Sequence, residues 1–259
     1  TGEVLKELIV DDVLDVKSLA VTAQGSVFVA AKHDDLTVDV LLSVSKNSDL
    51  EDYHTLPFVV DALAVIDEDP LVAYLKSIEG FPITYMSRLF GDNSWDKSVG
   101  IQLIAKGINV ENNSIDLFGT YYFSGASVVN FDGEGNIHWR YNSGEKNTSA
   151  TRSLTSLAND RKLLSFTTVV NVPTVDSAYL TQRTTNLRHH LIDSDGNTIR
   201  EITEAPYKEK VSLYWGMHEV LKAGITQNFG GLINESDEVV LLGEMEGEEQ
   251  EHETKLVLY

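Results

Sequence analysis

The sequence predicts an all-β fold in which one small sheet is repeated along the chain. Three observations support it: a short motif that returns five times, two hairpin turns of one composition, and the lack of a sustained helical period of apolar residues. A four-stranded antiparallel sheet that recurs about every 40–50 residues is the blade of a β-propeller. We therefore predict a five-bladed β-propeller of four-stranded antiparallel blades.

The repeated motif is a small or polar residue before Leu or Phe, followed by a turn and a β-rich run. The Leu or Phe marks the predicted first strand of each blade, and the run after the turn is rich in β-branched residues, as second strands require. The marker residues are Leu19, Leu63, Leu103, Leu154 and Phe229. The runs that follow them cover residues 26–31, 71–75, 115–123, 163–170 and 239–243.

The third and fourth strands of a blade are predicted from two matching turns. Residues 132–136 read Asp-Gly-Glu-Gly-Asn and residues 193–197 read Asp-Ser-Asp-Gly-Asn, each between two β-rich runs. Glycine supplies the positive φ that a tight hairpin turn demands. Both segments are therefore predicted to join antiparallel strands.

The two ends of the chain are predicted to close the ring. Residues 255–258 form a good third strand with no fourth strand after it, and residues 4–10 form a strand with no blade of their own. If residues 4–10 complete the last blade, no sheet edge of the ring stays unpaired.

The whole chain, residues 1–259, is predicted to be one domain with an insertion at residues 206–222. Leu154 and Phe229 are 75 positions apart, whereas the other marker residues are 40 to 51 apart. The excess lies in a segment whose aromatic residues interrupt the repeat. A six-bladed ring, with residues 211–222 as part of a weak blade, is the alternative.

The turn segments resemble those of PQQ-like and Asp-box β-propellers. The resemblance is carried by Phe131 to Asn136 and by Ile192 to Asn197, and it covers most of the chain as architecture. The Trp that closes a PQQ-like repeat is present only at Trp139, and the full Asp-box pattern Ser-x-Asp-x-Gly-x-x-Trp is absent. The resemblance therefore implies the fold type alone.

The charge of the chain excludes some partners. Forty acidic residues against 20 basic ones give a formal net charge of −20, which repels nucleic-acid phosphates and anionic lipids. No stretch approaches the roughly 20 apolar residues that cross a bilayer. We expect neither nucleic-acid binding nor membrane insertion.

The absence of cysteine excludes disulfides, thiolate metal sites and a Cys nucleophile. The opening residues, Thr1 to Val4, resemble neither a signal peptide nor a start methionine, which favours a processed chain and an extracellular or periplasmic location. His189 and His190 are neighbours on a predicted strand, so their side chains point to opposite faces and do not share a metal ion; one is expected to be packed and the other solvated. We expect no metal and no cofactor.

Candidate ligand-facing residues follow from the repeat, because the first strand of each propeller blade lines the central channel. The position two residues before the marker holds Lys17, Asp61, Arg152 and Gln227. Two cations beside a carboxylate suit an acidic sugar or acidic side chain, because Arg offers a planar fork to an oxyanion. Mutual pairing of these charges around a wet channel is the alternative.

The predicted insertion adds two aromatic candidates, Tyr214 and Trp215. Flat aromatic faces stack on sugar rings, and loops on a rigid sheet commonly carry binding residues. The alternative is that Trp215 seals the core beneath an irregular insertion.

Taken together, these features predict a non-enzymatic recognition or adhesion module that binds a glycan or a protein on one face of the ring. No nucleophile elbow, phosphate-binding loop or dinucleotide fingerprint is present. One alternative is a glycoside hydrolase that uses channel carboxylates such as Asp61. A second is a structural subunit of a surface assembly.

Overall fold

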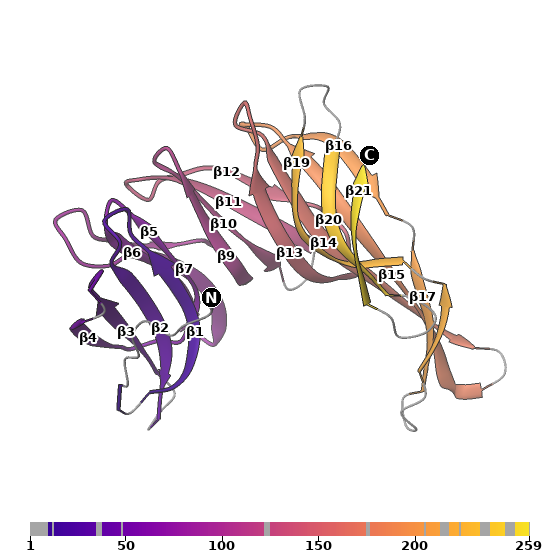
Figure 1. The fold of residues 1–259 in the computed structure, drawn as a ribbon, viewed down its shortest axis with the longest axis horizontal. Coiled ribbons are helices and arrows are strands. Elements are labelled where there is room, and N and C mark those ends of the chain that lie inside the picture. The colour runs from indigo at the N-terminus through magenta and orange to yellow at the C-terminus, as the bar shows by residue number, and fades with distance from the viewer. Residues whose placement is uncertain are drawn as a thin grey trace. The chain divides into compact units, whose positions relative to one another are not determined.

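The structure is a computed structural model in which all regular elements of the described residues are strands, grouped in five sheets (Figure 1). It describes residues 10–258 except 12, 35–37, 48, 122–124, 175–176, 205, 213–217, 223, 234–238 and 247–251. Side chains are described as far as residue 208, except those of 174 and 177–180. Within this part of the chain, no helix is long and apolar enough to cross a bilayer.

The first three sheets each contain four strands, and every strand hydrogen-bonds to the next one along the chain. All pairs of known register in them are antiparallel. The first sheet is β1 (Val13–Val21), β2 (Val27–His33), β3 (Asp39–Val44) and β4 (Leu50–Leu56). The second is β5 (Val60–Ile66), β6 (Asp69–Ile78), β7 (Phe81–Arg88) and β8 (Trp95–Ser98). The third is β9 (Leu103–Glu111), β10 (Ser114–Tyr121), β11 (Gly125–Asp132) and β12 (Ile137–Asn142).

The fourth sheet is larger than the others. Its strands are β13 (Thr148–Ser156), β14 (Lys162–Thr174), β15 (Ser177–Ile192), β16 (Thr198–Thr203), β17 (Tyr207–Ser212) and β18 (His218–Lys222). Strands β14 and β15 extend beyond β13 and β16, and the extended part of β15 pairs with β17. Residues 206–222, predicted as an insertion, thus supply a β17–β18 hairpin to this sheet.

The last sheet has three described strands, β19 (Gly224–Ile233), β20 (Val239–Glu246) and β21 (His252–Leu258). Strand β21 pairs with β20, as predicted for a third strand. The strand predicted to follow it, residues 4–10, lies outside the described residues except for Val10. Closure of the ring and its blade count, five or six, stay predictions.

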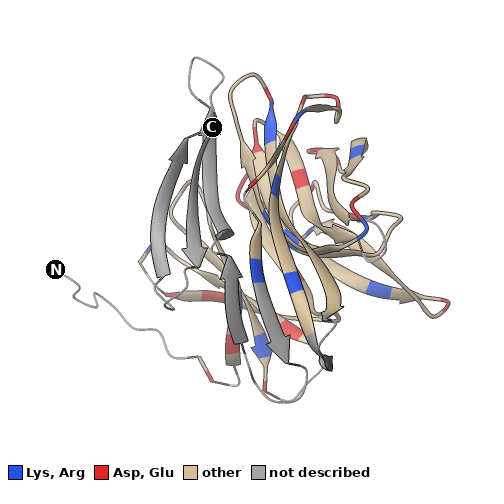
Figure 2. Cartoon of the chain, turned by 90° about the vertical axis from the view of Figure 1, so that its right-hand side faces the viewer, with Lys and Arg blue, Asp and Glu red and all other residues tan. Residues whose placement is uncertain are grey.

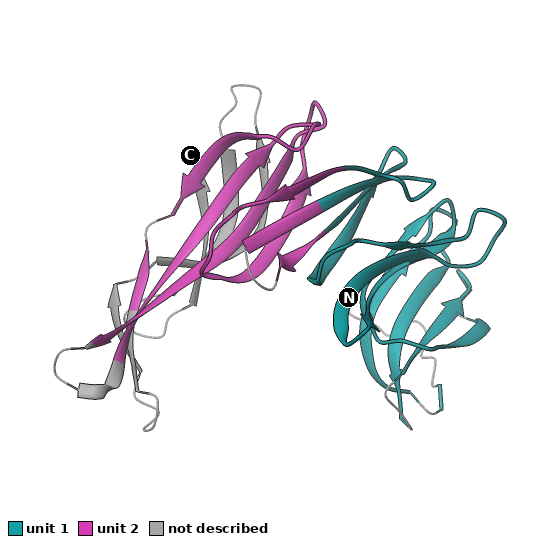
Figure 3. Cartoon of the chain, turned by 180° about the vertical axis from the view of Figure 1, so that it is seen from behind, with its two compact units in different colours: residues 1–117, 129–138 teal, residues 118–128, 139–259 magenta. Residues whose placement is uncertain are grey.

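The chain divides into two compact units (Figure 3). The first contains residues 1–117 and 129–138, and the second residues 118–128 and 139–259. In the first unit, β5 lies between β1 and β9, so the first strands of three consecutive sheets are neighbours. In the second unit, β13 lies beside β19. In a β-propeller the first strands of consecutive blades are neighbours, and the arrangement within each unit agrees with this.

The predicted all-β class is confirmed, and four-stranded antiparallel sheets are found in three of the five sheets that the structure describes. Each of the five marker residues lies on the first strand of a sheet: Leu19, Leu63, Leu103, Leu154 and Phe229. Apolar side chains between neighbouring sheets make the cores. In the first unit, Leu41 of β3 packs with Leu63 of β5 and Val72 of β6. In the second, Phe166 packs with Leu154 and Ile192.

Both predicted hairpin turns form, and an aspartate closes each of them. The Oδ1 atom of Asp132 accepts from the amides of Glu134 and Asn136, at 2.9 and 2.8 Å. In the same way, the Oδ1 atom of Asp193 accepts from Asp195 and Asn197, at 3.0 and 2.8 Å. Figure 2 shows acidic residues in red, both at loops and along strands.

A tryptophan from the preceding sheet packs against each turn glycine. A Cβ atom on Gly135 would lie 2.7 Å from Cδ2 of Trp95, and one on Gly196 would lie 2.9 Å from Cε3 of Trp139. Both glycines have a positive φ, 79° and 84°. Glycine is required here twice over, by its backbone conformation and by the ring that lies on it.

Candidate functional site

The predicted channel residues Lys17, Asp61 and Arg152 share a position in the structure: each is the extra residue of a β-bulge in a first strand. The pairing jumps from Val16 to Ser18 in β1, from Val60 to Ala62 in β5 and from Thr151 to Ser153 in β13. A bulge leaves one residue out of the ladder and re-aims its side chain. The sequence repeat thus identified a structural repeat of three bulges.

The last sheet differs from the prediction in its register. Gln227 is in register opposite Glu244 in β20, and the jump from Asn228 to Gly230 leaves out Phe229. The bulge that corresponds to Lys17, Asp61 and Arg152 is therefore at Phe229, two residues later than predicted. The side chains of β19 lie outside the described residues, and so do Tyr214 and Trp215.

Two of the bulged residues come together around a buried aspartate. The Nζ atom of Lys17 lies 2.7 Å from Oδ2 of Asp39, which also accepts a 2.7 Å hydrogen bond from the amide of Val60. The Asp39 side chain is 1% exposed, and its Oδ1 atom has no hydrogen-bond partner. Asp61 follows Val60 on β5. We call Lys17, Asp39 and Asp61 the bulge cluster.

The bulge cluster holds two carboxylates in different environments. Burial raises the pKa of Asp61; Lys17 opposes this rise and the charge of Asp39 adds to it. Asp39, in contrast, is almost fully buried and is held by an ammonium group and a backbone amide. Sequence analysis missed Asp39, although an aspartate directly before the apolar run Val40 to Leu42 indicates a buried, partnered carboxylate.

Arg152 lies in the second unit. Its Nε atom is buried and has no hydrogen-bond partner. The bulge cluster, in contrast, belongs entirely to the first unit.

The two histidines of β15 are both buried, which corrects the expectation that one of them is solvated. Ser165 Oγ lies 2.9 Å from Nδ1 of His189, whose Nε2 lies 3.4 Å from Oε1 of Glu204. None of these three residues is more than 2% exposed. The group has the composition of a hydrolytic triad, but a buried serine has no access to substrate, so we assign it to the core.

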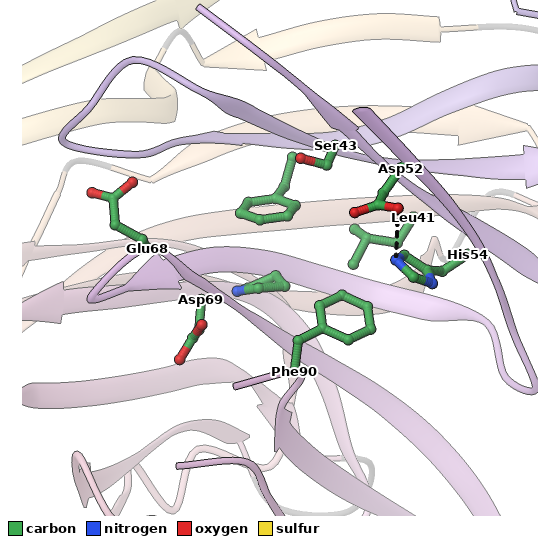
Figure 4. A pocket seen from close by; sticks show the side chains of 9 residues that line it. Leu41, Ser43, Asp52, His54, Glu68, Asp69 and Phe90 are labelled. Carbon is green, nitrogen blue, oxygen red and sulfur yellow. Dashed lines mark ion pairs between the residues drawn. The ribbon is translucent and has the colours of Figure 1, made fainter. Parts of the chain in front are cut away.

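A pocket of about 320 Å³ lies between the first and second sheets (Figure 4). We call it the Phe90 pocket. Strands β2, β3 and β4 contribute one wall, while the start of β6 and the β7–β8 loop contribute the other. In Figure 4, Asp52 and His54 lie on one side, Glu68 and Asp69 on the other, and the ring of Phe90 between them.

Phe90 is held in an unusual conformation at this pocket. Its φ is +64°, a region that bulky side chains rarely adopt. The ring lies 4.4 Å from the ring of His54, centroid to centroid, and the planes are inclined by 36°. The next residue, Gly91, is so close to Asp69 that a Cβ atom would lie 3.1 Å from its carboxylate oxygens. The Phe90 ring thus contacts one wall of the pocket, while the backbone that follows it lies against the other.

The charge of the Phe90 pocket is negative. Asp69 is neutralised by Arg88, whose Nε and Nη2 atoms lie 2.8 and 2.7 Å from Oδ2. Asp52 lies 4.0 Å from Nε2 of His54 and is mostly exposed, and Glu68 lines the opposite side. Of the lining residues that the structure describes, none is Lys or Arg.

These carboxylates are not arranged around a metal. Within the described ranges, no three His, Asp or Glu side chains are close enough to hold a metal ion. Carboxylate oxygens accept hydrogen bonds, so these side chains can receive hydroxyl or amino groups of a ligand. The pocket escaped sequence analysis because Phe28, Ser43, His54 and Phe90 share no spacing or motif.

Comparisons with known proteins assign no family. No family model matches the chain, and no curated protein does. The resemblance to PQQ-like and Asp-box repeats therefore has no family match behind it.

Solved structures give similarities that are extensive in coverage but low in score. One is a subtype N10 neuraminidase-like protein of A/little yellow-shouldered bat/Guatemala/060/2010, 8% identical, with a TM-score of 0.44 over 96% of this chain and 93% of that one. A neuraminidase-like protein from A/bat/Guatemala/164/2009 is 8% identical, with a TM-score of 0.42 over 93% and 86%. MPT-1, a GDP-Man-dependent mannosyltransferase from Leishmania mexicana, is 8% identical, with a TM-score of 0.31 over 93% and 82%. At these scores the similarities carry no argument about function.

Proposed function

We propose that the chain is a non-enzymatic recognition module that binds a saccharide in the Phe90 pocket. The observation that carries the proposal is the aromatic ring of Phe90, a residue at positive φ, beside a pocket whose charged lining includes three carboxylates and no Lys or Arg. A sugar ring has an apolar face that stacks on an aromatic ring and hydroxyl groups that donate to carboxylates. A volume of about 320 Å³ is within the roughly 300–1,000 Å³ range of small-molecule pockets.

The test is the substitution Phe90→Ala, with binding measured on a glycan array and by calorimetry. We expect the affinity for any array ligand to fall at least tenfold, because the stacking face is lost, while the melting temperature stays close to that of the wild type. Phe81→Ala is the control: Phe81 is 73% exposed on β7 and lines no part of this pocket. Wild-type affinity in Phe90→Ala, or no glycan bound at all, contradicts the proposal.

The second candidate function is saccharide hydrolysis at the bulge cluster. It is favoured by Asp61, whose raised pKa suits a general acid; Asp39, only 1% exposed, is too buried to reach a substrate and acts on Asp61 through its charge alone. We expect Asp61→Asn to abolish release of the aryl group from aryl glycosides, with Asp160→Asn as the control of equal charge change. Because the acid acts while protonated, activity falls as the pH rises through the pKa of Asp61. No hydrolysis by the wild type across a panel of glycosides rules this function out.

The third candidate, a structural subunit, is favoured by the surface of β1. Leu14, Val16, Leu19 and Val21 are between 59% and 63% exposed. The bulge at Lys17 shifts the alternation of the strand, so Val16, Leu19 and Val21 fall on one face. An exposed apolar stripe of this kind suits contact with another protein.

A further inference from the structure

A second pocket borders the first on the other side of the same two loops. It has a volume of about 490 Å³. We call it the Arg88 pocket. Its lining comes from the β5–β6 turn, the β7–β8 loop, the β9–β10 turn and the β11–β12 turn. These connections all lie at one end of their sheets, because each of them joins a first strand to a second or a third to a fourth.

The two pockets share their dividing wall. In the β5–β6 turn, Glu68 lines the Phe90 pocket and Asp67 lines the Arg88 pocket. In the β7–β8 loop, Phe90 lines the first and Asn93 the second. A ridge made of one turn and one loop therefore separates two cavities that open along the same sheet ends.

A buried ion pair connects the pockets beneath this ridge. Asp69 lines the Phe90 pocket, Arg88 lines the other, and the two are joined at 2.7 and 2.8 Å. The Arg88 side chain is only 5% exposed, and its Nη2 atom also lies 3.5 Å from Asp67. With these partners, the guanidinium group holds the turn and the loop together and is not free to bind an anion.

The far wall of the Arg88 pocket is firmly built. The Nε1 atom of Trp95 donates to the carbonyl oxygen of Gly133 at 3.0 Å, and its ring lies on Gly135. Asn113 packs against Gly133, where a Cβ atom would collide with its Oδ1. The pocket is thus part of the fixed packing between the second and third sheets.

The combined lining is acidic. The Phe90 pocket contributes Asp52, Glu68 and Asp69, and the Arg88 pocket contributes Asp67 and Glu134. Against these five carboxylates stands one guanidinium group, that of Arg88. A concave surface lined by negative charge concentrates cations and repels anions, and the Phe90 ring adds a favourable surface for a cationic group.

We infer that the two pockets are subsites of one groove that binds an oligosaccharide carrying free amino groups, with one sugar unit in each pocket. The inference rests on the proposed function, since it requires a saccharide in the Phe90 pocket. It adds the length and the charge of the ligand. Polar groups of Asn93, Asn113 and Glu134 receive the second unit, and the ridge at Asp67 and Glu68 lies beneath the linkage.

The experiment measures calorimetric affinities for glucosamine and for its β-1,4-linked dimer and trimer, alongside the N-acetylated series. For the wild type we expect the dimer to bind at least tenfold more tightly than the monomer, and each amino ligand to bind more tightly than its acetylated counterpart. Equal affinities for monomer, dimer and trimer overturn the joined subsites. Equal affinities for amino and acetylated ligands overturn the charge selectivity.

Variants separate this inference from the proposed function. We expect Glu134→Gln to lower the dimer affinity about tenfold and to leave the monomer affinity unchanged, because only the second subsite is altered. Asp160→Asn, the same charge change in the β13–β14 turn, lines neither pocket and is expected to bind both ligands like the wild type. A dimer affinity unaffected by Glu134→Gln overturns the groove, even if Phe90→Ala still abolishes monomer binding. If trilysine binds and no saccharide does, the proposed function fails as well.

Discussion

At the scale of single residues, the structure shows how burial sets the behaviour of charged groups. Asp39 is buried with a lysine and an amide as partners, Arg88 with two aspartates, and His190 with the Tyr141 hydroxyl. Each polar group is placed where a partner compensates the loss of water. The Lys17–Asp39 and Tyr141–His190 partnerships could not be predicted from the sequence, because the partners are 22 and 49 positions apart.

His190 is expected to make stability sensitive to acid. Burial lowers its pKa from the ordinary value of 6.5; Glu201 and Glu145 oppose this shift without cancelling it. The unfolded chain therefore binds a proton more readily than the folded one, and the free energy of unfolding falls as the pH drops below about 6.5 toward the lowered pKa. Urea unfolding at pH 7 and at pH 5 measures this loss.

The variant His190→Gln separates this effect from other titrations. It is expected to be less stable than the wild type at pH 7, because the Tyr141 bond is disturbed, yet to lose less stability between pH 7 and pH 5. His138→Gln, which removes a mostly exposed histidine, is expected to keep the wild-type pH dependence. If His190→Gln loses as much unfolding free energy between pH 7 and pH 5 as the wild type, His190 is not the group responsible for the loss.

At the scale of elements, neighbouring sheets are joined by a tryptophan that lies on a glycine turn. The pairs are Trp95 with Gly135 and Trp139 with Gly196. The turns themselves could be predicted from their Asp, Gly and Asn residues. The contacts could not, because the two members of each pair come from different sheets, and the fourth strands carry no common spacing to the next turn.

Gly135→Ala tests this contact. The new Cβ atom would lie 2.7 Å from the Trp95 ring at a backbone φ of 79°, so we expect a loss of about 2–4 kcal/mol in the free energy of unfolding. The control is Gly80→Ala, with a φ of 85° and no atom within 4 Å of the added Cβ. It incurs only the backbone cost of about 1 kcal/mol. Equal losses in the two variants would mean that the tryptophan moves aside freely.

At the scale of the whole molecule, the sequence predicted the repeat better than the site. All five marker residues lie on first strands, and Leu63, Leu103 and Leu154 are buried there, whereas Leu19 is exposed on β1. The positions predicted to line the channel coincide with bulges at Lys17, Asp61 and Arg152, but in the last sheet the bulge lies two residues after Gln227. Phe229 is the apolar marker residue of the last repeat, yet the strand register places it at the bulge of β19.

The candidate pockets show why a site is harder to predict than a sheet. The Phe90 pocket draws on four strands and two connections of two sheets, and only Asp52 and His54 among its polar residues follow the period of a strand. Phe90 and Gly91 give no signal in the sequence either, since positive φ is not expected of phenylalanine. Fold class depends on periodicity, while the pockets depend on which loops the fold brings together.

The bulges have an evolutionary consequence. A residue that the ladder skips makes no backbone pairing contribution, and the chain has a lysine, an aspartate, an arginine and a phenylalanine at the four equivalent points. Side chains of different chemistry can therefore occupy these four positions without a change in the strand pairing of the sheets. A family descended from such a chain would diversify its ligands there first.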